Sequence, residues 1–185
     1  MIRNSLLVLA TALVLGTTAC SNDSTSNAAA PAVPEKDIFS AILEADLATV
    51  ETHLAAGTSV DLREPTGNAT PLITACLLGD KEIVDVLLAA GADLEARNND
   101  GSTALMTAAF LAHIDVVQAL VDAGADIYVK DKNSDMTPGQ TAALPWQDVK
   151  PIYDLLTLVL TPTLGVEIDY DRIQADRPTI AEMLK

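Results

Sequence analysis

Apolar residues recur along this chain with the spacing of short helices, and the clearest unit covers residues 69–101. Here Thr70 precedes Pro71, and a hydroxyl N-cap followed by proline at the first helical position is a strong helix start. The pattern predicts a short helix of small residues over 73–78, after which Gly79 turns the chain.

A second, longer helix is predicted after this turn, because its large apolar residues fall on one helical face. These residues are Ile83, Val84, Leu87 and Leu88. Gly91 is predicted to end the helix as a left-handed C-cap, and residues 93–100 are polar and turn-forming. Residues 69–101 thus make one unit of two helices and a loop.

The same unit returns 33 residues later: 70–72 corresponds to 103–105, and the Gly-Ala-Asp of 91–93 to that of 124–126. A period of this length, made of a turn and two helices, indicates a stacked repeat protein. The two units resemble the ankyrin repeat, with its consensus T-P-L-H-x-A-A-x-x-G-H-x-E-V-V-x-L-L-L-x-x-G-A-D. The resemblance implies an all-α solenoid of helix-turn-helix units joined by loops and β-turns.

The consensus histidine that follows leucine is absent, because Ile73 and Met106 occupy its place. In the family this histidine hydrogen-bonds between neighbouring loops, so we expect these loops to be held less tightly. Of the two histidines in the chain, His113 matches the family's second histidine, which lies at the inter-helix turn, and His53 falls at a packing position of the first repeat. Cys76 lies in the small-residue slot and is predicted to be a buried, inert thiol.

The domain predicted from the pattern covers 35–185, with about four repeats and a truncated C-terminal capping helix. A degenerate first repeat covers 35–67. The fourth starts at Thr137, and its second helix is predicted over 148–160, with the extra residues held at 145–146 and 161–163. Its expected core-facing residues are Ile152, Leu155, Leu156 and Val159. Residues 177–184 are predicted to form the first helix of a fifth, truncated repeat, which would serve as the cap.

Residues 1–19 have the layout of a secretory signal peptide, with Arg3 before an apolar run over 6–15 and small residues after it. Small residues directly before Cys20 resemble the bacterial lipoprotein signal, which implies lipidation of Cys20, although Thr17 replaces the usual leucine. The alternative is ordinary cleavage near residue 19 with Cys20 incidental.

Residues 20–34 would then comprise the lipidated Cys20 and a tether. The tether is predicted to be disordered, because it has almost no large apolar side chains to bury. Ser21 after the cysteine implies, by the same resemblance, the outer membrane and a position facing the periplasm. Contact with the membrane is expected through the lipid alone.

Composition narrows the possible partners. Apolar residues make up 49% of the chain but aromatic residues only 3%, which suits closely packed helices of small residues. The net charge of −15 argues against nucleic acid, whose affinity depends on Lys and Arg, and against adsorption to anionic lipid. We expect a monomer with a protein partner.

Catalytic motifs are missing: the sequence contains no G-x-S-x-G, no glycine-rich phosphate loop, no H-E-x-x-H and no C-x-x-C. The nearest approach to a metal motif is the D-x-N-x-D run at 131–135, which lacks the Gly and Glu of a calcium loop. We therefore predict no enzymatic activity, cofactor or metal.

A partner-binding surface is predicted at the loop tips and on the exposed side of the short helices, where four large apolar residues would form a strip. The predicted residues are Leu77, Leu78, Arg97, Asn98, Asn99, Asp100, Phe110, Leu111, Lys130, Asp131 and Lys132. The favoured function is an envelope scaffold or protective partner. The alternative is an immunity-type inhibitor of a toxic enzyme, since an acidic protein steers basic partners.

Overall fold

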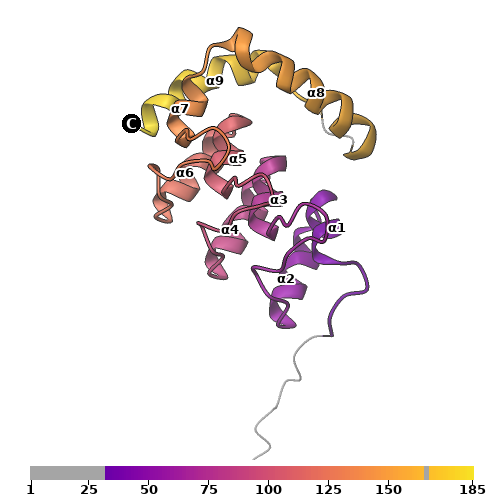
Figure 1. Cartoon of the computed structure of the whole chain (residues 1–185). Coiled ribbons are helices and arrows are strands. Elements are labelled where there is room, and N and C mark those ends of the chain that lie inside the picture. The colour runs from indigo at the N-terminus through magenta and orange to yellow at the C-terminus, as the bar shows by residue number, and fades with distance from the viewer. Residues whose placement is uncertain (1–31, 165–166) are drawn as a thin grey trace, which may run out of the picture.

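The computed structural model describes residues 32–164 and 167–185, so the predicted signal peptide, Cys20 and most of the tether lie outside it. These described residues form nine α-helices and no strand, as the sequence predicts. The first six helices form three pairs: α1 (Ile38–Leu43) with α2 (Leu47–Ala55), α3 (Pro71–Leu78) with α4 (Lys81–Ala89), and α5 (Ala104–Phe110) with α6 (Ile114–Asp122). The pairs stack in sequence order along one direction (Figure 1).

The predicted helix ends of the second repeat are confirmed. The Thr70 hydroxyl accepts a hydrogen bond from the backbone N–H of Ile73, and the Asp80 carboxylate accepts one from Ile83. Each bond satisfies one of the N–H groups that a helix start leaves unpaired. Gly91 has φ of 81°, and its counterpart Gly124 has φ of 95°, the left-handed conformation expected after a helix end.

The turn inside each helix pair also needs a left-handed residue, and only one repeat uses glycine there. Gly79 has φ of 74°, but the equivalent residues are Ala45, with φ of 54°, and Ala112, with φ of 57°. A residue with a Cβ pays roughly 1–2 kcal/mol in this conformation. The first and third repeats therefore carry a local backbone strain that the second avoids.

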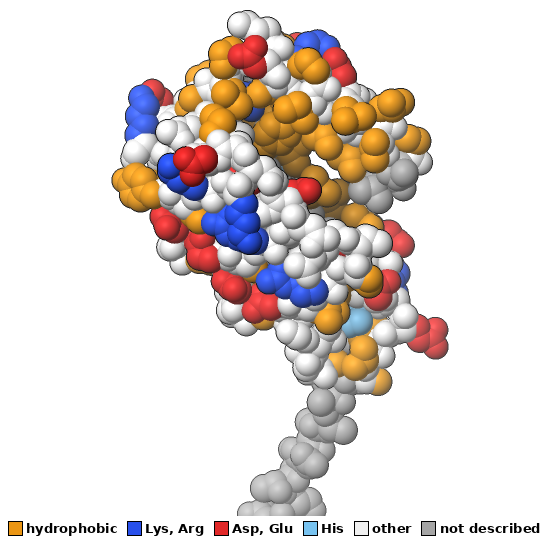
Figure 2. All heavy atoms as spheres, viewed as in Figure 1, with side chains coloured by type: hydrophobic (Ala, Val, Ile, Leu, Met, Phe, Trp, Pro, Cys, Tyr) orange, Lys and Arg blue, Asp and Glu red, His pale blue; other side chains and the backbone are white. Residues whose placement is uncertain are grey.

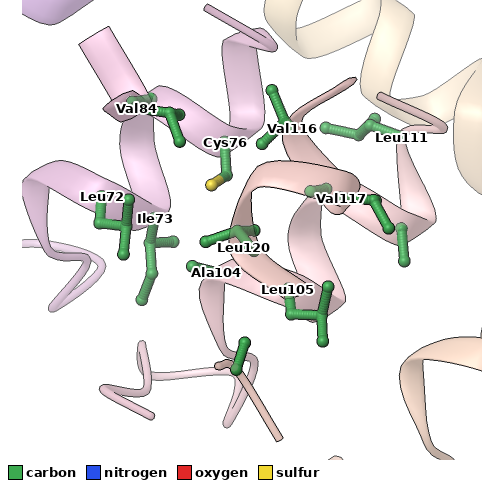
Figure 3. Close-up of a cluster of buried hydrophobic side chains, with 14 of the residues drawn as sticks. Leu72, Ile73, Cys76, Val84, Ala104, Leu105, Leu111, Val116, Val117 and Leu120 are labelled. Carbon is green, nitrogen blue, oxygen red and sulfur yellow. The ribbon is translucent and has the colours of Figure 1, made fainter. Parts of the chain in front are cut away.

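The core lies between successive helix pairs and is built mainly from aliphatic side chains. Figure 3 shows side chains of α3 and α4 and those of α5 and α6 meeting around Cys76. The fully buried residues here include Leu72, Cys76, Val84, Val117 and Leu120. Small residues on the short helices allow this close approach, because Ala75, Ala108 and Ala109 are also completely buried.

The C-terminal part departs from the repeat pattern. Helix α7 (Pro138–Ala143) continues the row of short helices, but the following helix α8 (Trp146–Leu164) does not pair with it as predicted. Instead α9 (Tyr170–Met183) packs against α7 and also against α6. It therefore continues the row of second helices formed by α2, α4 and α6. The predicted pairing of 148–160 with α7 is therefore wrong, and residues 161–163 belong to α8 instead of a loop.

Helix α9 also begins earlier than predicted. The Asp169 carboxylate accepts a hydrogen bond from the backbone N–H of Arg172 and so starts the helix at Tyr170. Pro178, which the sequence places in a first turn, lies inside the helix, where it removes one backbone hydrogen bond. The buried side chains of Ile173 and Ile180 hold this helix against its neighbours despite that loss.

Candidate protein-binding face

The loop tips, residues 63–66, 97–100 and 130–133, are joined to one another by arginine side chains. Arg63 Nη1 donates to the backbone carbonyl of Arg97 at 2.8 Å, and Arg97 Nη1 donates to that of Lys130 at 3.0 Å. Arg97, one of the predicted partner-binding residues, is therefore used within the array, and a direct role in binding stays a prediction.

Asparagine side chains make a second set of bonds between the same loops. Asn99 Nδ2 donates to the carbonyl of Thr66 at 3.0 Å, and Asn133 Nδ2 donates to that of Asp100 at 2.6 Å. The missing consensus histidine thus does not leave the loops unconnected. Arginine and asparagine side chains connect loops one repeat apart, and a looser hold than in the family stays a prediction.

The remaining predicted tip residues differ in what they offer to a partner. Asn98 is half-buried, and its side chain accepts a hydrogen bond from the backbone N–H of Ser102 at 2.9 Å. Lys130 pairs with Asp135 at 2.9 Å, but the pair is exposed and contributes little to stability. Asp100 and Lys132 are exposed, and neither forms an ion pair among residues 32–164 and 167–185.

Asp131 is a structural residue of its loop. Partial burial raises the pKa of its carboxyl, but hydrogen bonds from the backbone N–H groups of Ser134 and Asn133 lower it by more, so the pKa lies below its ordinary value. The carboxylate thus accepts hydrogen bonds within its own turn. In the part of the chain that the structure describes, no group of three or more His, Cys, Asp or Glu side chains is placed to hold a metal ion.

The predicted exposed strip of Leu77, Leu78, Phe110 and Leu111 is not exposed, and this expectation is wrong. Leu111 is buried, with 5% of its surface accessible, and the other three are half-buried against the core. The reason is that α8 and α9 cover this side of the short helices, as Figure 1 shows for α8.

Tyr153 holds α8 against the short helices. Its ring stacks on Phe110 with centroids 4.8 Å apart, and its hydroxyl donates to the Phe110 carbonyl. Arg177 is only 3% exposed as a residue, and its guanidinium donates to the Tyr153 hydroxyl at 2.9 Å and to the carbonyls of Thr141 and Leu144 at 2.7 and 3.2 Å. Burial raises the pKa of Tyr153, and the nearby Arg177 charge partly opposes this. One buried cation therefore connects α7, α8 and α9.

The face of α8 predicted to enter the core is exposed, because α9 occupies the place in which that face would be buried. Val149 and Tyr153 are the side chains that α8 buries. The predicted residues have these positions: Ile152, Leu155 and Val159 are exposed, and Leu156 is half-buried. Figure 2 shows the apolar side chains gathered over α8 beside a hollow.

This hollow, which we call the α8 groove, has a volume of about 220 Å³. Its floor includes Leu77, Met106 and Phe110 on the short helices, and its opposite wall is formed by Ile152 and Leu156 of α8. The loop residues at its rim are Asn98, Asp100 and Ser102. The groove thus brings together five of the predicted site residues: Leu77, Asn98, Asp100, Phe110 and Leu111. Its α8 wall is the part that sequence reasoning missed.

A family model described as ankyrin repeats (3 copies) matches residues 38–131, which is half of the chain. The chain belongs to the ankyrin-repeat family. Ankyrin repeats are a protein–protein interaction module and are typically not enzymes. A comparison with the curated proteins gave no match. The matched range ends before α7, so α7, α8 and α9 lie outside the part of the chain that matches the family.

Both histidines of this ankyrin-repeat protein have structural roles. His53 is buried, with its ring nitrogens 3.1 Å from the Thr58 hydroxyl and 2.6 Å from the Lys36 carbonyl. Burial lowers the pKa of His113 and the charge of Arg172 lowers it further, while a hydrogen bond with the Leu77 backbone opposes both.

Cys76 is fully buried, and burial raises the pKa of its thiol. A buried, protonated thiol is a poor nucleophile, since the thiolate is the reactive form. The predicted burial of Cys76 is confirmed, and its low reactivity stays a prediction. Among the described residues, no helix has the length and apolar content to cross a bilayer. Cys20, the predicted lipidation site, lies outside these residues.

Proposed function

We propose that this chain is an exported, lipid-anchored ankyrin-repeat protein that binds another protein in the bacterial envelope as a scaffold or protective partner. The observation that carries the proposal is the stacked ankyrin array with its rigid row of loop tips. Loops fixed in register lose little conformational freedom on binding, and such preorganisation favours affinity.

The anchoring part of the proposal depends on the N-terminal sequence. The apolar run over 6–15 and the small residues before Cys20 support export and lipidation. A lipid anchor contributes about 0.8 kcal/mol for each buried methylene, and two or more chains anchor a protein stably. The polar segment before α1 would then separate the array from the membrane.

Replacing Cys20 with serine tests the anchor. The wild-type chain should remain with membranes after a high-salt wash and should incorporate labelled palmitate. The Cys20→Ser variant should lose the label and become soluble or remain unprocessed. A Ser21→Ala variant is the matched control, since it keeps the thiol and should still be labelled. Palmitate incorporation into Cys20→Ser would refute lipidation at this residue.

Immunity-type inhibition of a toxic enzyme is a second candidate, and the net charge of −15 favours it. Strong acidity speeds association with a basic partner by electrostatic steering. A pull-down from the envelope separates the two functions. A resident envelope protein supports the scaffold, whereas a toxin encoded beside this chain supports immunity.

A further inference from the structure

The α8 groove has a composition that selects for one kind of occupant. Its floor and its α8 wall are apolar, since Met106, Phe110, Ile152 and Leu156 line it. Of its described lining residues, Asp100 alone carries a charge. Its volume of about 220 Å³ is below the roughly 300–1,000 Å³ of small-molecule sites, so one or two inserted side chains suit it better.

Asp100 lies at the rim of the groove on a fixed loop. Asn133 Nδ2 donates to its backbone carbonyl at 2.6 Å, and the Asn98 carbonyl of the same loop accepts from the Gly101 N–H at 3.0 Å. The Asp100 side chain is exposed and forms no ion pair within the described residues. A carboxylate presented in this way beside an apolar cavity favours an apolar side chain with a cation next to it.

We propose that the α8 groove binds a segment of the partner protein in which a leucine-, methionine- or phenylalanine-sized side chain is flanked by lysine or arginine. The anchor inserts between the short helices and α8, and the flanking cation pairs with Asp100. This proposal rests on the proposed function, because it specifies the chemistry of the protein partner. It assigns to α8 a role that the repeats alone cannot perform.

Charge and shape disfavour the other occupants. A second copy of this chain carries the same net charge of −15 and would bring acid toward acid. A flat bilayer surface does not fill a recess between two helices. The tether over 21–34 contains no lysine or arginine and almost no large apolar side chain, so it lacks the required chemistry.

The test uses the purified full-length chain and two displayed libraries of short random peptides. Each library fixes a central leucine or phenylalanine, flanked by lysine in one library and by glutamate in the other. Binding peptides should come from the lysine library. The tightest is then synthesised, and its Kd is measured by fluorescence polarisation against each variant.

Two variants remove the proposed contacts without removing core residues. Ile152→Ser changes a side chain that is 47% exposed, and Asp100→Asn keeps the size of the carboxylate. Each should weaken the peptide at least about tenfold, the effect of losing a strong anchor contact. The matched controls are Leu158→Ser, at a residue of α8 that is 72% exposed and outside the groove lining, and Glu51→Gln on α2. Both controls should change Kd less than about twofold.

Several outcomes would overturn the proposal: equal selection from the glutamate library, no selected peptide, or affinities that Ile152→Ser leaves unchanged while thermal melting is intact. A dimer by sedimentation that Ile152→Ser dissociates would assign the groove to a second copy. Binding to vesicles of phosphatidylethanolamine and phosphatidylglycerol that Leu158→Ser abolishes would assign α8 to lipid. After any of these outcomes, a protein that crosslinks to the loop tips in cells would still support the proposed function of protein binding. Absence of any crosslinked protein would overturn that function too.

Discussion

Truncation of Tyr153 should release α8 from the array, because this residue supplies the aromatic and polar contacts between α8 and α5. Tyr153→Phe removes only the hydroxyl, which leaves the Phe110 carbonyl without its donor and Arg177 without one of its acceptors. Unsatisfied buried polar groups cost about 1–3 kcal/mol, so we expect a loss of stability in that range.

Tyr153→Ala should cost more, since it also removes the ring. Stacking on Phe110 at 4.8 Å and on Trp146 at 5.5 Å is lost, and each such pair contributes about 0.5–1.5 kcal/mol beyond its buried area. Replacing a large buried aromatic residue with alanine typically costs about 3–5 kcal/mol. With a urea m-value of about 2 kcal/mol/M, the midpoint should fall by about 2 M.

Urea unfolding monitored by two signals tests this expectation. Trp146 is the single tryptophan of the chain and lies beside Tyr153, so its fluorescence reports on α8, while far-UV circular dichroism reports on all helices. In Tyr153→Ala the fluorescence transition should precede the dichroism transition. Tyr128→Ala, at a tyrosine that is 69% exposed, is the control and should shift either midpoint very little. Equal effects of the Tyr153 and Tyr128 variants would refute this account of how α8 is held.

Three further predictions concern the helix turns. Ala45→Gly should stabilise the chain by about 0.5 kcal/mol in thermal melting, because it relieves the strain of an alanine in the left-handed conformation. The control Ala48→Gly, inside α2, should instead destabilise the chain by about 1 kcal/mol. A lower Tm for Ala45→Gly than for the wild-type chain would contradict this account. Gly79→Ala should lower the free energy of unfolding more than Gly91→Ala does, because the new Cβ at position 79 would lie 2.4 Å from the His113 ring whereas the space at Gly91 is open. Adding His113→Ala to Gly79→Ala should recover part of this difference in urea midpoints. Because the folded pKa of His113 lies below its unfolded value of about 6.5, the free energy of unfolding should fall as the pH drops below about 6.5; His113→Gln should lessen that slope, and an unchanged slope would exclude this residue as its source.

Local signals explain why the central repeats were predictable. Thr70, Asp80 and Gly91 fix helix ends through bonds to residues a few positions away, so a single sequence suffices to place them. The repeat spacing also contains a further signal: Arg63, Arg97 and Lys130 recur at the repeat interval, and the side chains of the two arginines connect the loops.

The C-terminal arrangement could not be predicted in the same way. The apolar spacing of Ile152, Leu155 and Val159 correctly indicates a helix, but an apolar face shows nothing about which neighbour covers it. That choice is decided by contacts distant in sequence, such as Arg177 with the carbonyl of Thr141. The α8 groove depends on this choice, so sequence patterns could not indicate its α8 wall, although Leu77 and Phe110 of its floor were among the predicted site residues.

Paired photo-crosslinking in intact cells tests the central claim most directly. A photoreactive amino acid is placed at Asp100, on the loop rim of the groove, and in a separate strain at Glu51, which is exposed on α2 away from the groove lining. The account predicts a discrete protein adduct from position 100 and none from position 51. Adducts from position 51 alone, or from neither position, would contradict the claim that this face of the ankyrin array binds a protein.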